Sequence, residues 1–324
     1  MTDTPPLPRA AAAPEPSVHA TPGRLARLRQ SDFVYELERS PGALIAALVT
    51  LAFFILCFGA PLFAPHTPFD PATVSLRDSL LPPAWIEGGR WEFPLGTDDQ
   101  GRDILSMLLY GGRISLFVGF AAIGLGAAFG IAVGLAAGWL GGLFDSLAMR
   151  LADIQLSMPD VMLALFISGI ARAALPREAH ADIAVWILVF AIAAANWPQY
   201  ARVVRAATLA ARDLEYVQAA RVSGVPVLSL LVGHVLPGAL RPVLVIATVG
   251  LAFAILSEAA LSFVGVGMPP TQPTLGALIR IGNSYLFSGE WWVSLSPAFG
   301  LLALVLSVNV FGDWLRDRLG PSAR

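Results

Sequence analysis

The sequence contains no lysine, and all 21 of its basic residues are arginine. A conventional nucleotide-binding P-loop uses a lysine to reach the terminal phosphates, so this chain does not supply that loop. Charge of either sign is scarce, because only 14% of the residues are charged, against about a quarter in an average soluble protein. The net charge of −2 gives no reason to expect a nucleic-acid partner.

Cysteine occurs once, at Cys57 inside an apolar run, which excludes a disulfide within the chain. A lone cysteine in such a run is usually a small buried hydrophobic residue. The motifs H-E-x-x-H and G-x-S-x-G are absent. No pair of histidines has metal-ligand spacing; the four are His19, His66, His180 and His234. We therefore expect no catalytic residue, no metal site and no cofactor, and a protein that is not an enzyme.

Long apolar runs are abundant, with 56% hydrophobic residues and a mean hydropathy of +0.68. A membrane-spanning helix needs about 20 mostly apolar residues. Six candidate spans meet that need: residues 43–64, 114–139, 153–173, 183–200, 243–264 and 291–311. The third is the weakest because Asp153 and Asp160 lie at its start, and a shorter helix beginning after Pro159 is the alternative. The fold class predicted is all-α, a polytopic membrane protein with about six transmembrane helices.

Arginine is distributed unevenly along the chain, and the positive-inside rule converts this distribution into an orientation. Arginines precede the first span, separate the second from the third and the fourth from the fifth, and follow the sixth. The segment between the first two spans is acidic instead. An even number of spans then places both termini in the cytoplasm and the acidic segment outside.

Residues 1–30 are rich in proline, alanine and arginine and contain no apolar h-region. We expect a disordered cytoplasmic tail here rather than a secretory signal peptide. The first apolar run should act as an uncleaved signal anchor. Residues 31–110 then form an N-terminal segment that carries the first span and the external loop.

Glycine is concentrated in the second span, where it recurs at every fourth position: Gly126, Gly130, Gly134 and Gly138. Such a stripe of small residues lets two helix backbones approach closely. We favour packing within this chain, and packing against a partner subunit is the alternative.

The segment between the fourth and fifth spans, residues 201–241, is too long for a tight turn. Residues 213–222 have the pattern of a short amphipathic helix, and Gly224 just after them predicts its end. A second helical piece, residues 227–236, is expected to end at Pro237. The small residues of the first piece offer a slim surface that can enter a groove in a partner. The alternative is an ordinary amphipathic loop lying on the membrane surface.

Within this segment the chain resembles the EAA loop of ABC importer permeases. The resemblance rests on Gln218-Ala219-Ala220, on Gly224, and on His234-Val235-Leu236-Pro237. In that family the loop forms a coupling helix that docks in a cleft of the ATPase subunit. Gln218 stands where the family has its name-giving glutamate, and His234 stands where many members have isoleucine. The coupling residues implied by the resemblance are Tyr216, Gln218, Ala219, Ala220, Gly224, His234, Leu236 and Pro237.

Further stretches resemble the dipeptide and oligopeptide permeases of the C type, which carry a MetI-like transmembrane domain. They are residues 94–106, 112–116, 258–267, 291–292 and 312–317. The resemblance covers the chain from about Ser31 to the end. It implies that residues 111–324 form the permease domain, with a cytoplasmic coupling loop at residues 201–241.

The resemblance also implies a function and a set of partners. The chain would be a subunit of a binding-protein-dependent ABC importer in the bacterial inner membrane, moving dipeptides or oligopeptides with ATP hydrolysed by other subunits. The implied partners are a second homologous permease, two ABC ATPase subunits, a soluble substrate-binding protein, a peptide substrate and the lipid bilayer. Two other classes fit less well. An intramembrane enzyme needs a polar constellation inside the spans, and a secondary transporter needs repeats and several intramembrane charges.

Glu258 is the one serious candidate for a charge inside a span, where an ionised carboxylate is costly. One interpretation is that it lines the translocation path with Ser257, Ser262 and Asn196, or meets the amino group of a peptide. The other, which we favour, is that Glu258 pairs with a neighbouring helix or lies near the membrane interface.

A charged cluster precedes the second span and consists of Asp98, Asp99, Arg102 and Asp103. Nothing near it supplies a nucleophile, so we expect a capped turn on the outer side, ahead of a helix at residues 104–110. Three tryptophans, Trp197, Trp291 and Trp292, are expected to anchor spans at the membrane interface. Pro198 is expected to kink the fourth span.

Overall fold

The computed structural model describes residues 36–69, 74–176, 180–269 and 272–319. The tail expected at residues 1–30 lies outside the described residues. The chain divides into two compact units, Met1–Pro41 and Gly42–Arg324. Within the first, a short helical turn is described at residues 36–38.

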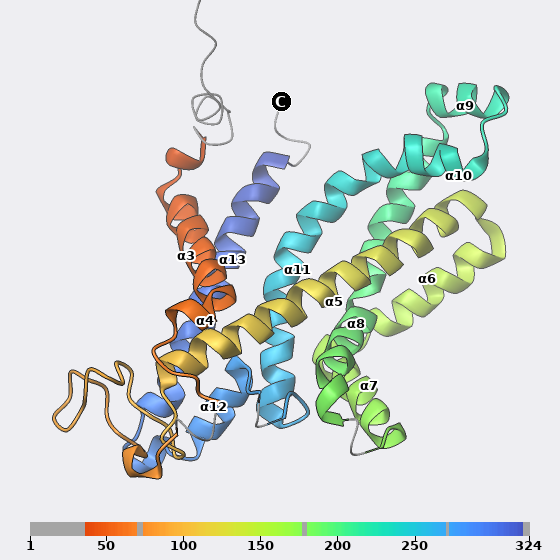
Figure 1. Ribbon diagram of the computed structural model, residues 1–324. Coiled ribbons are helices and arrows are strands. Elements are labelled where there is room, and N and C mark those ends of the chain that lie inside the picture. The colour runs from red at the N-terminus through yellow and green to blue at the C-terminus, as the bar shows by residue number, and fades with distance from the viewer. Residues whose placement is uncertain (1–35, 70–73, 177–179, 270–271, 320–324) are drawn as a thin grey trace, which may run out of the picture. The chain divides into compact units, whose positions relative to one another are not determined.

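Helices dominate the described part of the chain, where the only strand-like feature is an isolated bridge between Thr97 and Asp103. The α-helices in Figure 1 are α3 (Pro41–Phe58), α4 (Ala60–Phe63), α5 (Ile104–Leu140), α6 (Gly142–Leu156), α7 (Asp160–Ala174), α8 (His180–Arg212), α9 (Glu215–Val222), α10 (Val227–Leu230), α11 (Leu236–Val264), α12 (Leu275–Asn283) and α13 (Trp292–Leu319). A π-helical segment, η3 (Leu231–Val235), joins α10 to α11. Short 3-10 turns lie at η1 (Leu76–Asp78) and η4 (Leu286–Ser288). The all-α prediction is confirmed.

Five helical stretches among the described residues are long and apolar enough to cross a membrane. They are Pro41–Phe58, Ile104–Leu140, Ile183–Arg212, Val227–Val264 and Trp292–Arg318. A sixth crossing results if α6 and α7, which meet at a bend of 100°, count as one broken span. The prediction of about six transmembrane helices is therefore confirmed.

The third predicted span, residues 153–173, is wrong as a single helix. α6 ends at Leu156, and α7 begins at Asp160, directly after Pro159. Proline has no amide hydrogen, and it disfavours the helical conformation at the residue before it, Met158. The alternative of a shorter helix after Pro159 describes α7 correctly.

Two predicted spans belong to longer helices. Residues 114–139 and the short helix expected at 104–110 are both parts of α5, and residues 183–200 continue as α8 to Arg212. Hydropathy marks only the apolar part of a helix, whereas the backbone hydrogen bonds run on into polar surroundings. With a rise of about 1.5 Å per residue, the 37 residues of α5 extend about 55 Å. The hydrocarbon core is about 30 Å thick, so α5 tilts or projects beyond it.

The glycine stripe of α5 lies against α8. A Cβ on Gly130 would come within 2.6 Å of the Trp197 carbonyl oxygen, and a Cβ on Gly134 within 2.5 Å of the Ala201 carbonyl oxygen. These are backbone atoms, which cannot turn aside as a flexible side chain could. The stripe therefore serves packing within this chain, as we predicted.

The core of the unit forms where α5, α7, α8 and α11 meet. A second cluster joins α3 to α5, α11, α12 and α13 around the fully buried Cys57 and Leu116. Large apolar side chains on α3, α6 and α7 are exposed instead, among them Ile45, Leu48, Leu143, Leu147, Met162 and Phe166. Outward-facing apolar side chains are expected of helices whose surroundings are lipid.

Candidate functional site

The short helix α9 lies between the end of α8 and the start of α11 (Figure 1). Val217 packs α9 against the rest of the chain: its side chain is 1% exposed and contacts Leu230 and Val235. Apolar side chains from the end of α5 border this cluster. The buried side of the helix is thus fixed to α5, to α10 and to η3, the segment that leads into α11.

The other side of α9 is open. Tyr216 is 52% exposed and Val222 is 89% exposed, and Gln218 and Ala219 are exposed between them. Ala220 is half-buried at the edge of the Val217 cluster. The open face therefore combines small side chains with a few apolar ones, a surface typical of a site that a partner covers.

Gly224 follows the end of α9 in a left-handed backbone conformation, with φ at +80°. Glycine adopts this conformation without the strain that a Cβ causes. Apart from its two neighbours in sequence, no described residue has an atom within 4 Å of the position that a Cβ would take. Gly224 is therefore required by the turn itself, and the space beside it is open to a partner.

His234 lies in the π-helical segment η3 and stacks on Tyr216, with ring centroids 6.4 Å apart and planes at 26°. Its Nδ1 is buried and has no hydrogen-bond partner among the described residues. The stack gives α9 a second link to the start of α11. Leu236 and Pro237 follow at once as the first residues of α11.

The expected end of a helical piece at Pro237 is wrong, because the chain remains helical from Val227 to Val264. In an α-helix the proline ring clashes with the carbonyl group four residues earlier. The π segment just before Pro237 has a wider turn, in which the Leu236 amide donates to the Leu231 carbonyl oxygen. The backbone register therefore changes ahead of the proline, and the helix passes through it.

Two arginines of α8, the helix that precedes α9, link α8 to α6 and to α5. Arg205 pairs with both carboxylate oxygens of Asp145 in α6, one of them at 2.6 Å. Arg212 donates to the Gly138 carbonyl oxygen at the end of α5, at 3.4 Å. A displacement of α9 would thus reach α5, α6, α8 and α11 through packed or hydrogen-bonded neighbours.

Glu258 of α11 is fully buried. Its Oε2 accepts a hydrogen bond from Ser115 Oγ at 2.6 Å, and its Oε1 accepts one from Ser262 Oγ, also at 2.6 Å. Ser115 belongs to α5, so the carboxylate pairs α11 with a neighbouring helix. Sequence reasoning did not single out Ser115, although it lies in one of the stretches that carry the family resemblance, residues 112–116.

The other candidates for the translocation path have different surroundings. Ser257 is half-buried beside Glu258, while Asn196 lies on α8 and is 6% exposed. The Asn196 amide donates to the Ile192 carbonyl oxygen at 2.8 Å, and its oxygen accepts from Gln199 at 2.9 Å. Asn196 thus satisfies its polar groups within its own helix, and a path role for these residues stays a prediction.

The prediction that Trp197 anchors α8 at a membrane interface is wrong. It is 7% exposed, and its indole Nε1 donates to Gln155 Oε1 at 3.0 Å. Gln155 belongs to α6, so the indole holds α6 against α8. Pro198 lies inside the continuous helix α8, directly after this contact.

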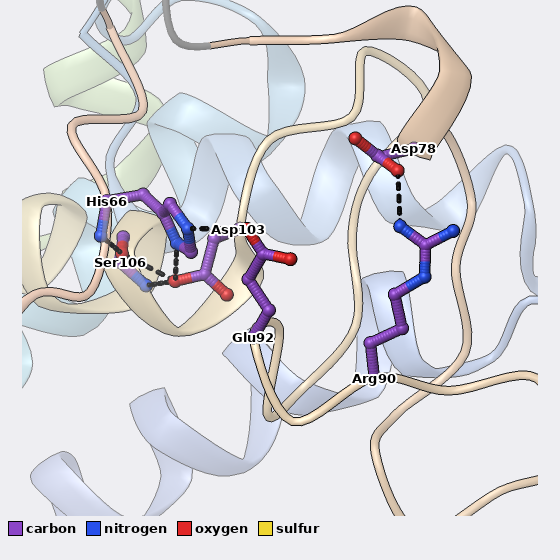
Figure 2. Close-up of polar contacts among 6 residues, drawn as sticks. All are labelled: His66, Asp78, Arg90, Glu92, Asp103 and Ser106. Atoms are coloured by element: carbon purple, nitrogen blue, oxygen red, sulfur yellow. Dashed lines mark hydrogen bonds and ion pairs between the residues drawn. The ribbon is translucent and has the colours of Figure 1, made fainter.

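The charged turn ahead of α5 is built as expected. Asp103 is the N-cap of α5 and accepts from the Ser106 amide at 2.9 Å. Asp98 pairs with Arg102 at 2.6 Å within the same turn. Figure 2 shows that His66 reaches this cap from the end of the first span: its amide donates to Ser106 Oγ at 3.1 Å.

The loop between α4 and α5, residues 64–103, is named the outer loop after its predicted position, and ionisable side chains also hold it. The His66 ring has Nδ1 at 3.8 Å from Asp103 Oδ2 and Nε2 at 3.8 Å from Glu92 Oε1 (Figure 2). Arg90 pairs with Asp78 at 2.9 Å across the loop. No group of three or more His, Cys, Asp or Glu side chains in the described ranges could hold a metal ion.

Aromatic residues between α12 and α13 hold the same loop. Trp292 is 8% exposed, and its Nε1 donates to the Thr97 carbonyl oxygen at 3.4 Å. The negative charge of the Asp99 carboxylate raises the pKa of Tyr285, which lies between the two helices. Trp292 therefore fastens the loop instead of standing free at a membrane interface, whereas its neighbour Trp291 is 38% exposed.

Residues 130–324 match the family of binding-protein-dependent transport system inner membrane components. The chain is 38% identical over 293 residues to the dipeptide transport system permease protein DppC of Haemophilus influenzae, covering 90% of this chain and 95% of that protein. It is 39% identical over 280 residues to the di/tripeptide transport system permease protein DppC of Pseudomonas aeruginosa, covering 86% and 88%. It is 36% identical over 294 residues to the dipeptide transport system permease protein DppC of Escherichia coli K12, covering 90% and 93%.

The fold and these similarities together define a class of protein, the membrane-spanning permeases. The chain belongs to the family of inner-membrane components of binding-protein-dependent transport systems. It is a multi-pass permease subunit of the inner membrane, a transport component rather than an enzyme. Membership of this family implies ATPase and substrate-binding partners.

Proposed function

We propose that this permease imports dipeptides or oligopeptides and takes its energy from two ABC ATPase subunits, one of which docks on α9. The supporting observation is α9 itself, which exposes small and apolar side chains on one face and is seated by Val217 on the other. A motor that binds the open face can move α5, and through η3 also α11, because the buried face packs against α5 and η3.

The substrate class is inferred from the relatives. Proteins named for dipeptide and di/tripeptide transport are 36% to 39% identical to this chain over most of its length. We infer that a soluble binding protein delivers peptides to the outer face of this chain as well. We also infer a second, homologous permease that completes the pore, because C-type permeases pair with a distinct partner.

The orientation and division of the chain are part of the proposal. Residues 1–30 would be a cytoplasmic tail, residues 31–110 would carry the first span and the outer loop, and residues 111–324 would form the permease domain. The coupling loop at residues 201–241 has α9 and η3 at its centre. In Figure 1, α9 and the end of α13 lie at one end of the unit, opposite α12 and the outer loop, which supports a cytoplasmic α9 and C-terminus.

A matched pair of substitutions at Gly224 tests the docking role. Asparagine and aspartate tolerate the left-handed conformation better than other side chains do, so both keep the turn at similar cost. Gly224→Asp adds a charge on the docking side, and we expect uptake to fall about tenfold or more while ATPase subunits no longer co-purify. Gly224→Asn should stay within about threefold of the wild type. The measurements are peptide uptake into proteoliposomes and recovery of the ATPase subunits.

A bulky side chain on the open face gives a second, independent test. Ala219 is exposed, whereas a bulky residue at the half-buried Ala220 would also disturb the Val217 cluster. Ala219→Trp should block docking, and Ala174→Trp, an exposed alanine at the end of α7, is the matched control. Normal uptake and normal ATPase recovery in both Gly224→Asp and Ala219→Trp would reject the docking role. A wild-type assembly that binds its ATPases but takes up no peptide would reject only the peptide substrate.

A further inference from the structure

Glu258 is a buried carboxylate without a cation. No ion pair involves it among the described residues. Its oxygens accept hydrogen bonds from the hydroxyl groups of Ser115 and Ser262, and the Thr274 hydroxyl is a further hydrogen-bond partner. Burying an ionisable group in a membrane-spanning helix is costly and needs a reason. A substrate contact needs an accessible atom, and Glu258 has none in this conformation, since it is 0% exposed.

The contacts of Glu258 extend to a third helix, α12, directly through its N-cap residue Thr274 and indirectly through Ser115. The backbone amide of Leu275, the first residue of α12, donates to Ser115 Oγ at 3.4 Å. The Ser115 hydroxyl in turn donates to Glu258 at 2.6 Å. A hydroxyl oxygen can accept one hydrogen bond while its proton is donated to another group. One carboxylate therefore connects α11, α5 and the N-terminus of α12; we call Glu258, Ser115, Ser262 and Leu275 the outer knot.

The backbones touch where the outer knot lies. A Cβ on Gly276 of α12 would come within 2.2 Å of the Ala259 carbonyl oxygen of α11. A Cβ on Gly111 of α5 would come within 3.1 Å of the Pro273 carbonyl oxygen, just before α12. The start of α12 is thus pressed against both neighbours, and the hydrogen bonds of the outer knot fix its register between them.

The opposite end of α11 is bound differently. Gly233 and Gly238 have no atom within 4 Å of their Cβ positions, and the π segment and Pro237 interrupt the regular α-helical hydrogen bonds there. Motion delivered by α9 thus enters α11 at the end where the regular α-helical hydrogen bonds are interrupted. The outer knot would hold the other end of α11 in place.

We propose that Glu258 is a positioning residue that fixes the N-terminus of α12 to α5 and α11, so that the outer ends of these three helices move as one body during transport. Glu258 acts through its hydrogen bonds and not through its charge. A glutamine preserves both bonds, because its oxygen accepts from one serine and its amide group donates to the other. An alanine removes both bonds and leaves a cavity.

The test compares Glu258→Gln with Glu258→Ala in the complete transporter, with its ATPases and binding protein, in proteoliposomes. Hydrogen exchange of the amides of α12 reports the position of that helix, and uptake kinetics report transport. Glu258→Ala should raise the exchange of α12 amides about tenfold, as expected when buried hydrogen bonds are lost. It should lower the maximal uptake rate and leave the half-saturating substrate concentration unchanged. Glu258→Gln should match the wild type in both measurements.

The controls separate positioning from substrate contact. Ser257→Ala removes a hydroxyl next to Glu258 that is outside the outer knot, and should leave α12 exchange unchanged. Ser115→Ala removes one of the two links between Glu258 and α12 and leaves the Thr274 link in place. It should raise α12 exchange, though by less than Glu258→Ala does, and it can be measured even if Glu258→Ala does not assemble. The proposal is overturned if Glu258→Gln is as impaired as Glu258→Ala, or if Ser115→Ala leaves α12 exchange at the wild-type level. The exchange measurement needs no peptide, so it tests the positioning role of Glu258 independently of the proposed function.

Discussion

At the scale of single residues, Asp103 has two roles at the start of α5. It accepts hydrogen bonds from the amide and the hydroxyl of Ser106, and it lies 3.8 Å from the His66 ring. Asp103→Ala removes the N-cap, so we expect the free energy of unfolding to fall by about 1 kcal/mol. Thermal unfolding of the purified permease in detergent measures this change.

Asp103→Asn is the matched control for that loss. Asparagine caps helices about as well as aspartate but carries no charge, so this variant should keep most of the stability. Unfolding of Asp103→Ala at the wild-type temperature would show that Trp292 and His66 hold the outer loop without help from the cap.

The reach of sequence reasoning at this scale depends on sequence separation. The cap at Asp103 was predictable because an N-cap contacts a residue three positions on. Glu258 was noticeable as an acid in an apolar run, but its partner Ser115 lies 143 residues away, and no local pattern joins the two. The interface role of Trp197 failed for the same reason, because Gln155, 42 residues away, binds its indole.

At the scale of elements, the contact between α5 and α8 depends on the absence of side chains. A Cβ on Gly130 would come within 2.6 Å of the Trp197 carbonyl oxygen, while Gly124 of the same helix has no neighbour within 4 Å. Alanine favours a helix over glycine by about 1 kcal/mol, so Gly124→Ala should be neutral or stabilising. Gly130→Ala should instead destabilise the protein by about 1–3 kcal/mol, because α8 must shift. Thermal unfolding of the two variants, side by side, provides the measurement; equal stability would contradict the close contact.

Hydropathy predicted that these elements exist but not where they end. The apolar runs were found because a bilayer selects for them, whereas α8 continues into arginine-containing sequence that hydropathy excludes. The first residues of α5, 104–113, are mostly apolar but end in Gly111, Gly112 and Arg113, which separated them from the predicted span. The break at Pro159 was available as an alternative from the proline alone. The continuation of the helix through Pro237 could not be predicted from the proline, because it depends on the π turn at η3. That turn has no sequence signature of its own.

At the scale of the whole molecule, the proposed topology depends on whether α6 and α7 together cross the membrane. They meet at a bend of 100°, and only their combination is long and apolar enough for a span. If they cross as one broken span, α9 lies on the opposite side of the membrane from the outer loop. If they do not, the chain crosses the membrane an even number of times between the outer loop and α9, and the two lie on the same side.

Labelling of single cysteines decides between these topologies. In a Cys57→Ser background, Glu87→Cys places a thiol at an exposed position of the outer loop, and Val222→Cys places one at the end of α9, where the native side chain is 89% exposed. A membrane-impermeant maleimide added outside intact spheroplasts should label residue 87 and leave residue 222 unlabelled until the membrane is permeabilised. Labelling of both positions from outside would mean that α6 and α7 do not cross, and would remove α9 from the reach of cytoplasmic ATPases. The same experiment therefore tests the orientation on which the coupling role of α9 depends.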